Sequence, residues 1–214
     1  MDDLLNRSDE LHIEILALLE RVEAFPGIRH EVALVACGMA LEHALSLRLL
    51  IRTQCFTSAL SLLRLQYEAL TRGVWLLYAA TDLQVETLSS ALTIEAEHCA
   101  KKMPMFSAML DQVIEKAPIQ ASRMLLNFKE VNWQAMNSFV HSGIHPLRRH
   151  AEGYPAGLVD GAIRNSNGLN IMVLQLGVIL SGDPSFEGVV RAMQEKYHAL
   201  LPGLISPLPQ NNKL

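Results

Sequence analysis

A short run of charged side chains lies along one side of an otherwise apolar segment. Arg64, Glu68 and Arg72 follow one another at intervals of four residues. In a helix this spacing puts them on one face, where a carboxylate between two guanidiniums forms an ion-pair ladder. Arginines that a carboxylate orients in this way can bind an anionic ligand through paired hydrogen bonds. A plain solvent-exposed face would have the same pattern.

A second polar stripe ends in a histidine. Asn137 is followed one helical turn later by His141, at the end of another predicted helix. A histidine titrates near neutral pH and can act as a general acid or base, although it could also be a simple surface cap. If the two stripes face each other, we expect Arg64, Glu68, Asn137 and His141 to meet in one partly buried cleft as the catalytic group.

A cationic stretch follows this histidine, between Ser142 and Gly157. The glycines and prolines of this stretch predict an irregular loop. Its positive charges suit the phosphate groups of a ligand or of RNA, and they equally suit an ordinary solvated turn. The predicted ligand-binding residues are three of its side chains and one from the first stripe: Arg72, His145, Arg148 and Arg149.

The histidines also offer a metal-binding alternative. His141 and His145 are four residues apart, and with His43 on another predicted helix they resemble the three-histidine site of DinB-like bundles. Gly143 and Pro146 interrupt the helix that this spacing requires. The sequence therefore favours a site without a metal or another cofactor, and a DinB-like metal site is kept as an alternative.

The elements that position these side chains are helices from end to end of the chain. We expect an all-α, single-domain bundle of seven to eight helices over residues 1–201, followed by a flexible C-terminal tail at 202–214. Neither the alternation typical of strands nor an internal repeat stands out in the sequence. The predicted helices are 2–24, 29–51, 55–80, 81–102, a short one between Pro104 and Pro118, 119–141, 156–180 and 185–201.

Composition limits the classes of function. Half of the 214 residues are apolar and 19% are charged, which suits a folded domain with a sizeable core. A formal net charge of -4 argues against a general nucleic-acid coat protein, but a local basic site remains compatible with it.

Location and redox state follow from similar evidence. The acidic N-terminus does not fit a targeting signal, and the purely apolar runs are shorter than the ~20 residues of a membrane span. We expect a cytoplasmic protein without membrane contact. Its three cysteines, Cys37, Cys55 and Cys99, lack metal or redox spacing, so we expect reduced and buried thiols.

Two segments, Leu63–Leu76 and Asn137–Gly143, resemble poorly characterised bacterial helical proteins similar to the HEPN group. HEPN proteins are all-α and usually dimeric, and many are metal-independent ribonucleases of toxin–antitoxin or phage-defence systems. Their signature is an arginine followed four to six residues later by a histidine. The chain departs from this signature, because Asn170 stands where a histidine would follow Arg164.

The resemblance implies a homodimer that binds RNA or another phosphate-bearing ligand, or that cleaves RNA without a metal. His141 would then act as the general acid or base, and Arg64 or Arg148 would stabilise the charge on phosphorus. One alternative is a non-catalytic, antitoxin-like module that binds a protein partner. A DinB-like metal-binding bundle is the second alternative.

Overall fold

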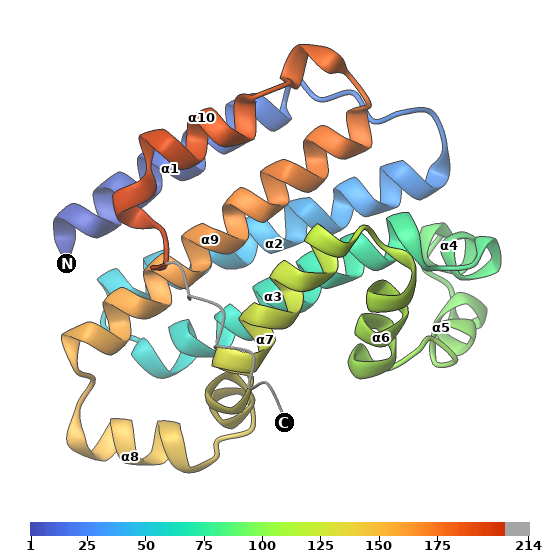
Figure 1. Ribbon diagram of the computed structural model, residues 1–214. Helices are drawn as coiled ribbons and strands as arrows, with labels where there is room; N and C mark the ends of the chain where they lie inside the picture. The colour runs from blue at the N-terminus through green and yellow to red at the C-terminus, as the bar shows by residue number, and fades with distance from the viewer. Residues whose placement is uncertain (204–214) are drawn as a thin grey trace, which may run out of the picture.

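The computed structural model describes residues 1–203, and within them it contains ten α-helices, two short 3₁₀ segments and no strand (Figure 1). The all-α prediction is confirmed for this part of the chain, but the predicted count of seven to eight helices is wrong. The helices are α1 (Asp2–Leu19), α2 (Ile28–Arg52), α3 (Phe56–Tyr78), α4 (Asp82–Ser89), α5 (Ile94–Ala100), α6 (Phe106–Lys116), α7 (Ile119–Val140), α8 (Ile144–Glu152), α9 (Ala156–Ser181) and α10 (Val189–Lys196).

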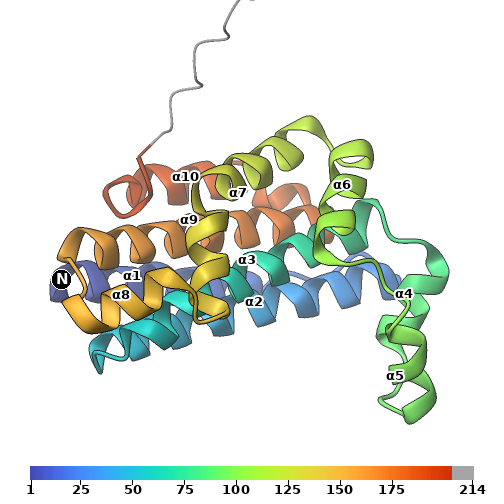
Figure 2. The same ribbon diagram turned by 90° about the horizontal axis from the view of Figure 1, so that it is seen from below.

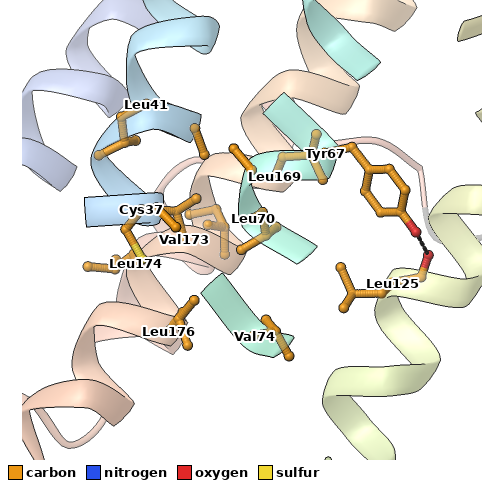
Figure 3. Packing of buried hydrophobic residues seen from close by; sticks show 14 of the residues in the cluster. Cys37, Leu41, Tyr67, Leu70, Val74, Leu125, Leu169, Val173, Leu174 and Leu176 are labelled. Atoms are coloured by element: carbon orange, nitrogen blue, oxygen red, sulfur yellow. Dashed lines mark hydrogen bonds between the residues drawn. The ribbon is translucent and has the colours of Figure 1, made fainter. Parts of the chain in front are cut away.

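The centre of the bundle is formed by α2, α3 and α9, which contact one another along most of their lengths. α3 and α9 are apolar around most of their circumference, so they must be covered on several sides. α1 packs on α9, and α7 packs on α3 (Figure 1). Tyr67 on α3 is fully buried, and its hydroxyl donates a hydrogen bond to the carbonyl oxygen of Leu125 on α7 at 2.9 Å (Figure 3).

A polar contact is buried inside this apolar core. The side-chain amide of Gln66 on α3 donates to the carbonyl oxygen of Ser166 and to Oδ1 of Asn170 on α9, both at 3.0 Å. The hydroxyl of Ser166 donates to Oε1 of Gln66 at 2.7 Å in return. Because buried polar groups are costly without partners, this reciprocal set fixes the register of α3 against α9.

The predicted helix at 81–102 is two helices in the structure. The Thr81 hydroxyl accepts from the Gln84 backbone and caps the start of α4. The hydroxyl of Ser90 donates back to the carbonyl oxygen of Glu86 at 2.7 Å at the end of this helix. Thr93 then caps α5. A hydroxyl side chain that forms a hydrogen bond with the nearby backbone can end a helix in this way. The prediction of a single helix at 81–102 is therefore wrong.

The predicted loop between Ser142 and Gly157 is also wrong, because residues 144–152 form α8. Pro146 lies in the first turn of this helix, where its missing N–H group has no helical partner to lose. The side chain of Pro146 is buried, and the backbone resumes an irregular path at Gly153 with φ of 96°. The cationic residues are therefore presented by a helix.

The helices near both ends of the described chain are shorter than predicted. α1 ends at Leu19 instead of residue 24. The predicted helix at 185–201 consists of the 3₁₀ segment Pro184–Phe186, α10 and a second 3₁₀ segment, His198–Leu200. Gly188, with φ of 77°, separates the first two in a left-handed conformation that favours glycine. Most of the predicted tail, 204–214, lies outside the described residues.

α2 has the length and composition of a membrane-crossing helix, contrary to the expectation from purely apolar runs. Within the described residues, 44% of its most apolar stretch is buried inside the bundle. Of the three thiols, Cys37 on α2 is buried as predicted, and burial raises its pKa to about 12. Cys55 and Cys99 are exposed, because they lie at a helix junction and on α5, which buries no side chain.

Candidate anion-binding site

The guanidinium of Arg64 connects the two predicted polar stripes. Its Nε donates to Oε1 of Glu68 at 2.7 Å, one turn further along α3. One terminal nitrogen donates to Oδ1 of Asn137 on α7 at 2.6 Å and lies 3.1 Å from Nε2 of His141. The structure thus brings together the four side chains that the sequence grouped, since α7 crosses α3 with its polar stripe toward Arg64.

The cluster lies at the surface and is only half-buried. The side chain of Arg64 is 15% exposed and that of Glu68 is 27% exposed. Asn137 and His141 are exposed, because they lie in the last turn of α7 and directly after it. The expected partly buried position therefore holds only for the two residues of α3, and the amide and the imidazole border open solvent.

An aromatic side chain that the sequence reading missed completes the support of Arg64. The guanidinium carbon lies 4.7 Å from the centre of the Trp133 ring, a cation–π geometry. Trp133 in turn stacks on Phe106 of α6 at 5.1 Å between ring centres, with the rings 10° from parallel. Trp133 precedes Asn137 by four residues and so lies on the same stripe of α7. That spacing was the signal that could have identified it.

The turn after α7 sets the position of His141. Ser142 has φ of 52°, a left-handed conformation that reverses the chain at the end of the helix. Gly143 then passes so close to α7 that a Cβ atom there would lie 2.6 Å from Oγ of Ser138. The same hydroxyl accepts a hydrogen bond from the backbone N–H of His145 at 3.1 Å, at the start of α8. Ser138 and Gly143 therefore fix the turn between α7 and α8, from which His141 reaches Arg64.

The groups of the cluster that stay free are mostly hydrogen-bond donors. Because Nε2 of His141 accepts from Arg64, its Nδ1 carries the proton. Because Oδ1 of Asn137 accepts from Arg64, its NH₂ group is left to donate. The second terminal nitrogen of Arg64 has no partner within residues 1–203. The cluster thus has three free donor groups, one on the guanidinium itself and two on the side chains bound to it, and donors of this kind suit an anion with several oxygens.

The remaining predicted ligand-binding residues lie apart from this centre. Arg72 is exposed on α3 and forms no ion pair in the described part of the chain, so the predicted ladder stops at Glu68, which turns toward Arg64. On α8, Arg148 is exposed and pairs with Glu152, whereas Arg149 is half-buried. His145 is exposed near the ring of Phe139. α8 itself contacts α7 and α3, the two helices that form the cluster.

The three histidines of the DinB-like alternative do not assemble. His43 lies half-buried on α2, and among residues 1–203 no group of three or more His, Cys, Asp or Glu side chains could hold a metal ion. The DinB-like hypothesis required one such group formed by His43, His141 and His145. It is therefore wrong for the described residues.

A second polar cluster, which sequence reasoning also missed, joins α1 to α2. Nε of Arg48, which is 1% exposed, donates to Oδ1 of Asp9 at 2.6 Å, and Arg52 donates to the other oxygen of this carboxylate at 2.6 Å. The two arginines hold the pKa of Asp9 below its usual value, against the opposing effect of burial. Burial and the charge of Arg48 lower the pKa of the neighbouring His12 to about 4. Arg48 and His12 are buried in this cluster, Asp9 and Arg52 are partly exposed, and the cluster ties α1 to α2.

A model of one protein family matches residues 37–203, and it is described as a family of unknown function, DUF6988. The matched residues run from the middle of α2 to the end of the described chain and include the whole Arg64 cluster. No curated protein and no solved structure matches the chain.

Proposed function

The chain belongs to the DUF6988 family, and we propose from the geometry of the Arg64 cluster that it binds the phosphate backbone of RNA. The observation that carries the proposal is the pattern of free donors. Arg64 occupies an acceptor atom of Asn137 and of His141, and both side chains are exposed, so each keeps a donor that solvent or a ligand can reach. A phosphodiester offers two unesterified oxygens that such donors can bind.

Further cations next to the cluster favour a polymer over a single phosphate. α8 begins three residues after His141 and carries His145, Arg148 and Arg149. The next phosphates of a bound strand would pass along this helix, where each contact adds a salt-dependent attraction. The net charge of -4 keeps binding local, because the rest of the surface repels nucleic acid.

In this proposal the chain works in the cytoplasm as a HEPN-like protein of a toxin–antitoxin or defence system. Its support is the resemblance of residues 63–76 and 137–143 together with the position of these segments. The first contains Arg64 and Glu68, and the second contains Asn137 and His141. The segments that resemble HEPN proteins thus provide the cluster that would bind RNA.

Fluorescence anisotropy with a labelled single-stranded RNA tests this proposal. Arg64→Ala should weaken binding at least tenfold, and raising the salt concentration should weaken wild-type binding. The matched control is Arg191→Ala, because Arg191 also forms an i,i+4 ion pair with a glutamate but lies 84% exposed on α10. Equal loss in both variants, or wild-type protein that binds no RNA at low salt, would contradict the proposal. The second result would instead favour the antitoxin-like interaction module.

A second candidate function is metal-independent cleavage of the bound strand. Glu68 has one carboxylate oxygen outside its bond to Arg64, and His141 carries a proton on Nδ1. Glu68 could take the proton of a ribose 2′-hydroxyl, whose oxygen attacks phosphorus. For this step His141 would take up a second proton, which frees its Nε2 from Arg64; the imidazolium would then give a proton to the departing 5′-oxygen and return to the neutral form. A 2′,3′-cyclic phosphate would result. Arg64 would stabilise the charge on the phosphoryl oxygens.

Gel analysis of RNA incubated with a chelator tests this second candidate. Cleavage should persist in the chelator, yield cyclic phosphate ends and disappear in both His141→Ala and Glu68→Gln. The same RNA with a 2′-deoxy substitution should bind and remain intact. Binding without any cleavage by the wild-type protein would rule out this mechanism and leave the binding proposal standing.

A further inference from the structure

The outward side of α2 is an exposed face on which half of the residues are large and apolar. Nine of its residues are exposed, and eight of them alternate at spacings of three and four residues. These spacings place the eight residues on one face of the helix, in a repeat of seven residues. Four of the eight are large and apolar, with Val35 64% exposed and Leu49 54% exposed. The eight positions are Ile28, Glu31, Val35, Gly38, Glu42, Leu45, Leu49 and Arg52.

Gly38 lies near the middle of this exposed face. An added Cβ atom there would meet no described atom within 4 Å, so the packing inside the chain does not require a glycine. Glycine in the interior of a helix costs roughly 0.5–1 kcal/mol relative to alanine. A helix from another molecule could approach closely at this position, and such an approach accounts for the glycine.

The short helices α4 and α5 extend beyond this face at the N-terminal end of α2 (Figure 2). A groove lies in the corner between α2 and α4, lined mainly by Ile28, Val32, Val35 and Leu88, with Glu31 at its polar edge. In the loop between α4 and α5, Leu92 is 94% exposed. We call the projecting pair α4 and α5 the arm. The groove and the arm therefore extend the apolar surface of α2 at its N-terminal end only.

The charges at the two ends of α2 are opposite. Glu31 is exposed in its first turn, and Arg52 is exposed in its last turn. Arg52 shares the carboxylate of Asp9 with the buried Arg48, so two positive charges face one negative charge there. The C-terminal end of α2 thus keeps a net positive charge that Asp9 does not cancel.

We propose that the exposed face of α2 binds the same face of a second copy of the chain, with the two helices antiparallel. A two-fold axis through the middle of α2, near residue 40, pairs each position of the repeat with one in the second copy. Leu45 then faces Val35, and Leu49 enters the corner groove beside Glu31. Arg52 of the second copy comes within one turn of Glu31. This inference does not depend on RNA binding.

Charge favours this occupant, and the arm adds to the contact area. α2 has 25 residues and is about 37 Å long and about 10–12 Å across, so its outward face covers about 400 Å². Stable interfaces bury about 800 Å² per partner, and the arm of each copy would supply the remainder by reaching past the end of the other α2. A parallel pair would place Glu31 against Glu31 and both arms at one end. If this face bound a bilayer instead, the charged side chains of Glu31 and Glu42 would have to enter the membrane.

Light scattering after size exclusion gives the first test. The wild-type protein should elute as a dimer, and Val35→Glu should give a folded monomer by circular dichroism. Val131→Glu is the matched control, because Val131 is 60% exposed on α7 and should leave the dimer intact. A monomeric wild-type protein at high concentration, or equal dissociation by both variants, would overturn the proposal. Binding of the wild-type protein to anionic vesicles with loss of the dimer would also overturn it.

Disulfide crosslinking tests the orientation. In a Cys55→Ser, Cys99→Ser background, a mixture of Glu31→Cys and Leu49→Cys proteins should form a crosslinked heterodimer on mild oxidation. Each protein alone should not, because the two copies of either position would lie about 27 Å apart, beyond the reach of a disulfide. Crosslinking of Glu31→Cys with itself would show a parallel or different pair and would refute the antiparallel arrangement.

Discussion

Arg64 and His141 are 77 positions apart in the chain, yet one terminal guanidinium nitrogen lies 3.1 Å from Nε2 of the imidazole. Since an arginine can only donate, the histidine must accept through this nitrogen and carry its proton on Nδ1. The contact joins the middle of α3 to the turn that follows α7. It thereby fixes both the direction and the tautomer of the one histidine in the cluster.

Arg64→Ala should lower the free energy of unfolding by about 1–2 kcal/mol. The side chain loses a half-buried ion pair and its contact with Trp133, which together exceed the value of an exposed pair. Urea denaturation measures the change. Arg191→Ala, which removes an exposed i,i+4 pair, should cost less than about 0.5 kcal/mol. Equal costs would show that Arg64 contributes no more than a surface residue.

Gly143→Ala should disturb the turn that carries His141. The new Cβ atom would lie 2.6 Å from Oγ of Ser138, so the turn or the end of α7 must shift. We expect a loss of about 1–3 kcal/mol in stability and weaker RNA binding. Adding Ser138→Ala removes the closest atom and should recover part of both losses. A Gly143→Ala protein with unchanged binding would show that the turn does not position the site.

His12 should make the stability depend on pH in a defined window. Its pKa is about 4 in the folded protein, against 6.5 for an ordinary histidine, so the unfolded chain takes up the proton first as the pH falls. Stability from this group is therefore complete above about pH 6.5 and declines between 6.5 and 4, by roughly 3 kcal/mol in total. Thermal melts across this range should show the decline, and His12→Leu should remove most of it. An identical slope in the variant would assign the effect to other groups.

Gln66→Ala should destabilise the protein by about 2–4 kcal/mol. It creates a cavity in the core and removes the partners of Ser166 and of Asn170 Oδ1. Gln134→Ala on the exposed side of α7 is the control, and it should change stability by less than about 0.5 kcal/mol. Chemical denaturation compares the two variants. A small loss at position 66 would mean that water replaces the missing amide.

The sequence allowed the main cluster to be predicted because helical spacing determines which side chains share a face. Arg64 with Glu68, and Asn137 with His141, are each four residues apart, and the assumption that two polar stripes face each other completed the group. The same rule applied to Trp133 would have included it. Spacing along one helix is therefore enough for contacts that lie within one face.

Contacts between remote helices were beyond this reasoning. The hydrogen bond from Gln66 to Asn170 joins residues 104 positions apart, and neither stripe predicts it. A single polar residue on an apolar helix has the same pattern whether it is exposed or paired in the core. The wrong prediction at α8 has a local cause: a proline predicts the end of a helix, whereas Pro146 lies in the first turn of one.

The connection between α2 and α3 has a consequence for how the chain folds. Two helices of 25 and 23 residues are joined by only Thr53–Cys55 and share the most extensive contact of any helix pair in the described chain. Contacts close in sequence cost little loop-closure entropy, so this hairpin should form early and α9, which begins only at Ala156, should dock last. Pulse-labelled amide exchange during refolding would then show protection in α2 and α3 before α9. Early protection of α9 would indicate a different nucleus.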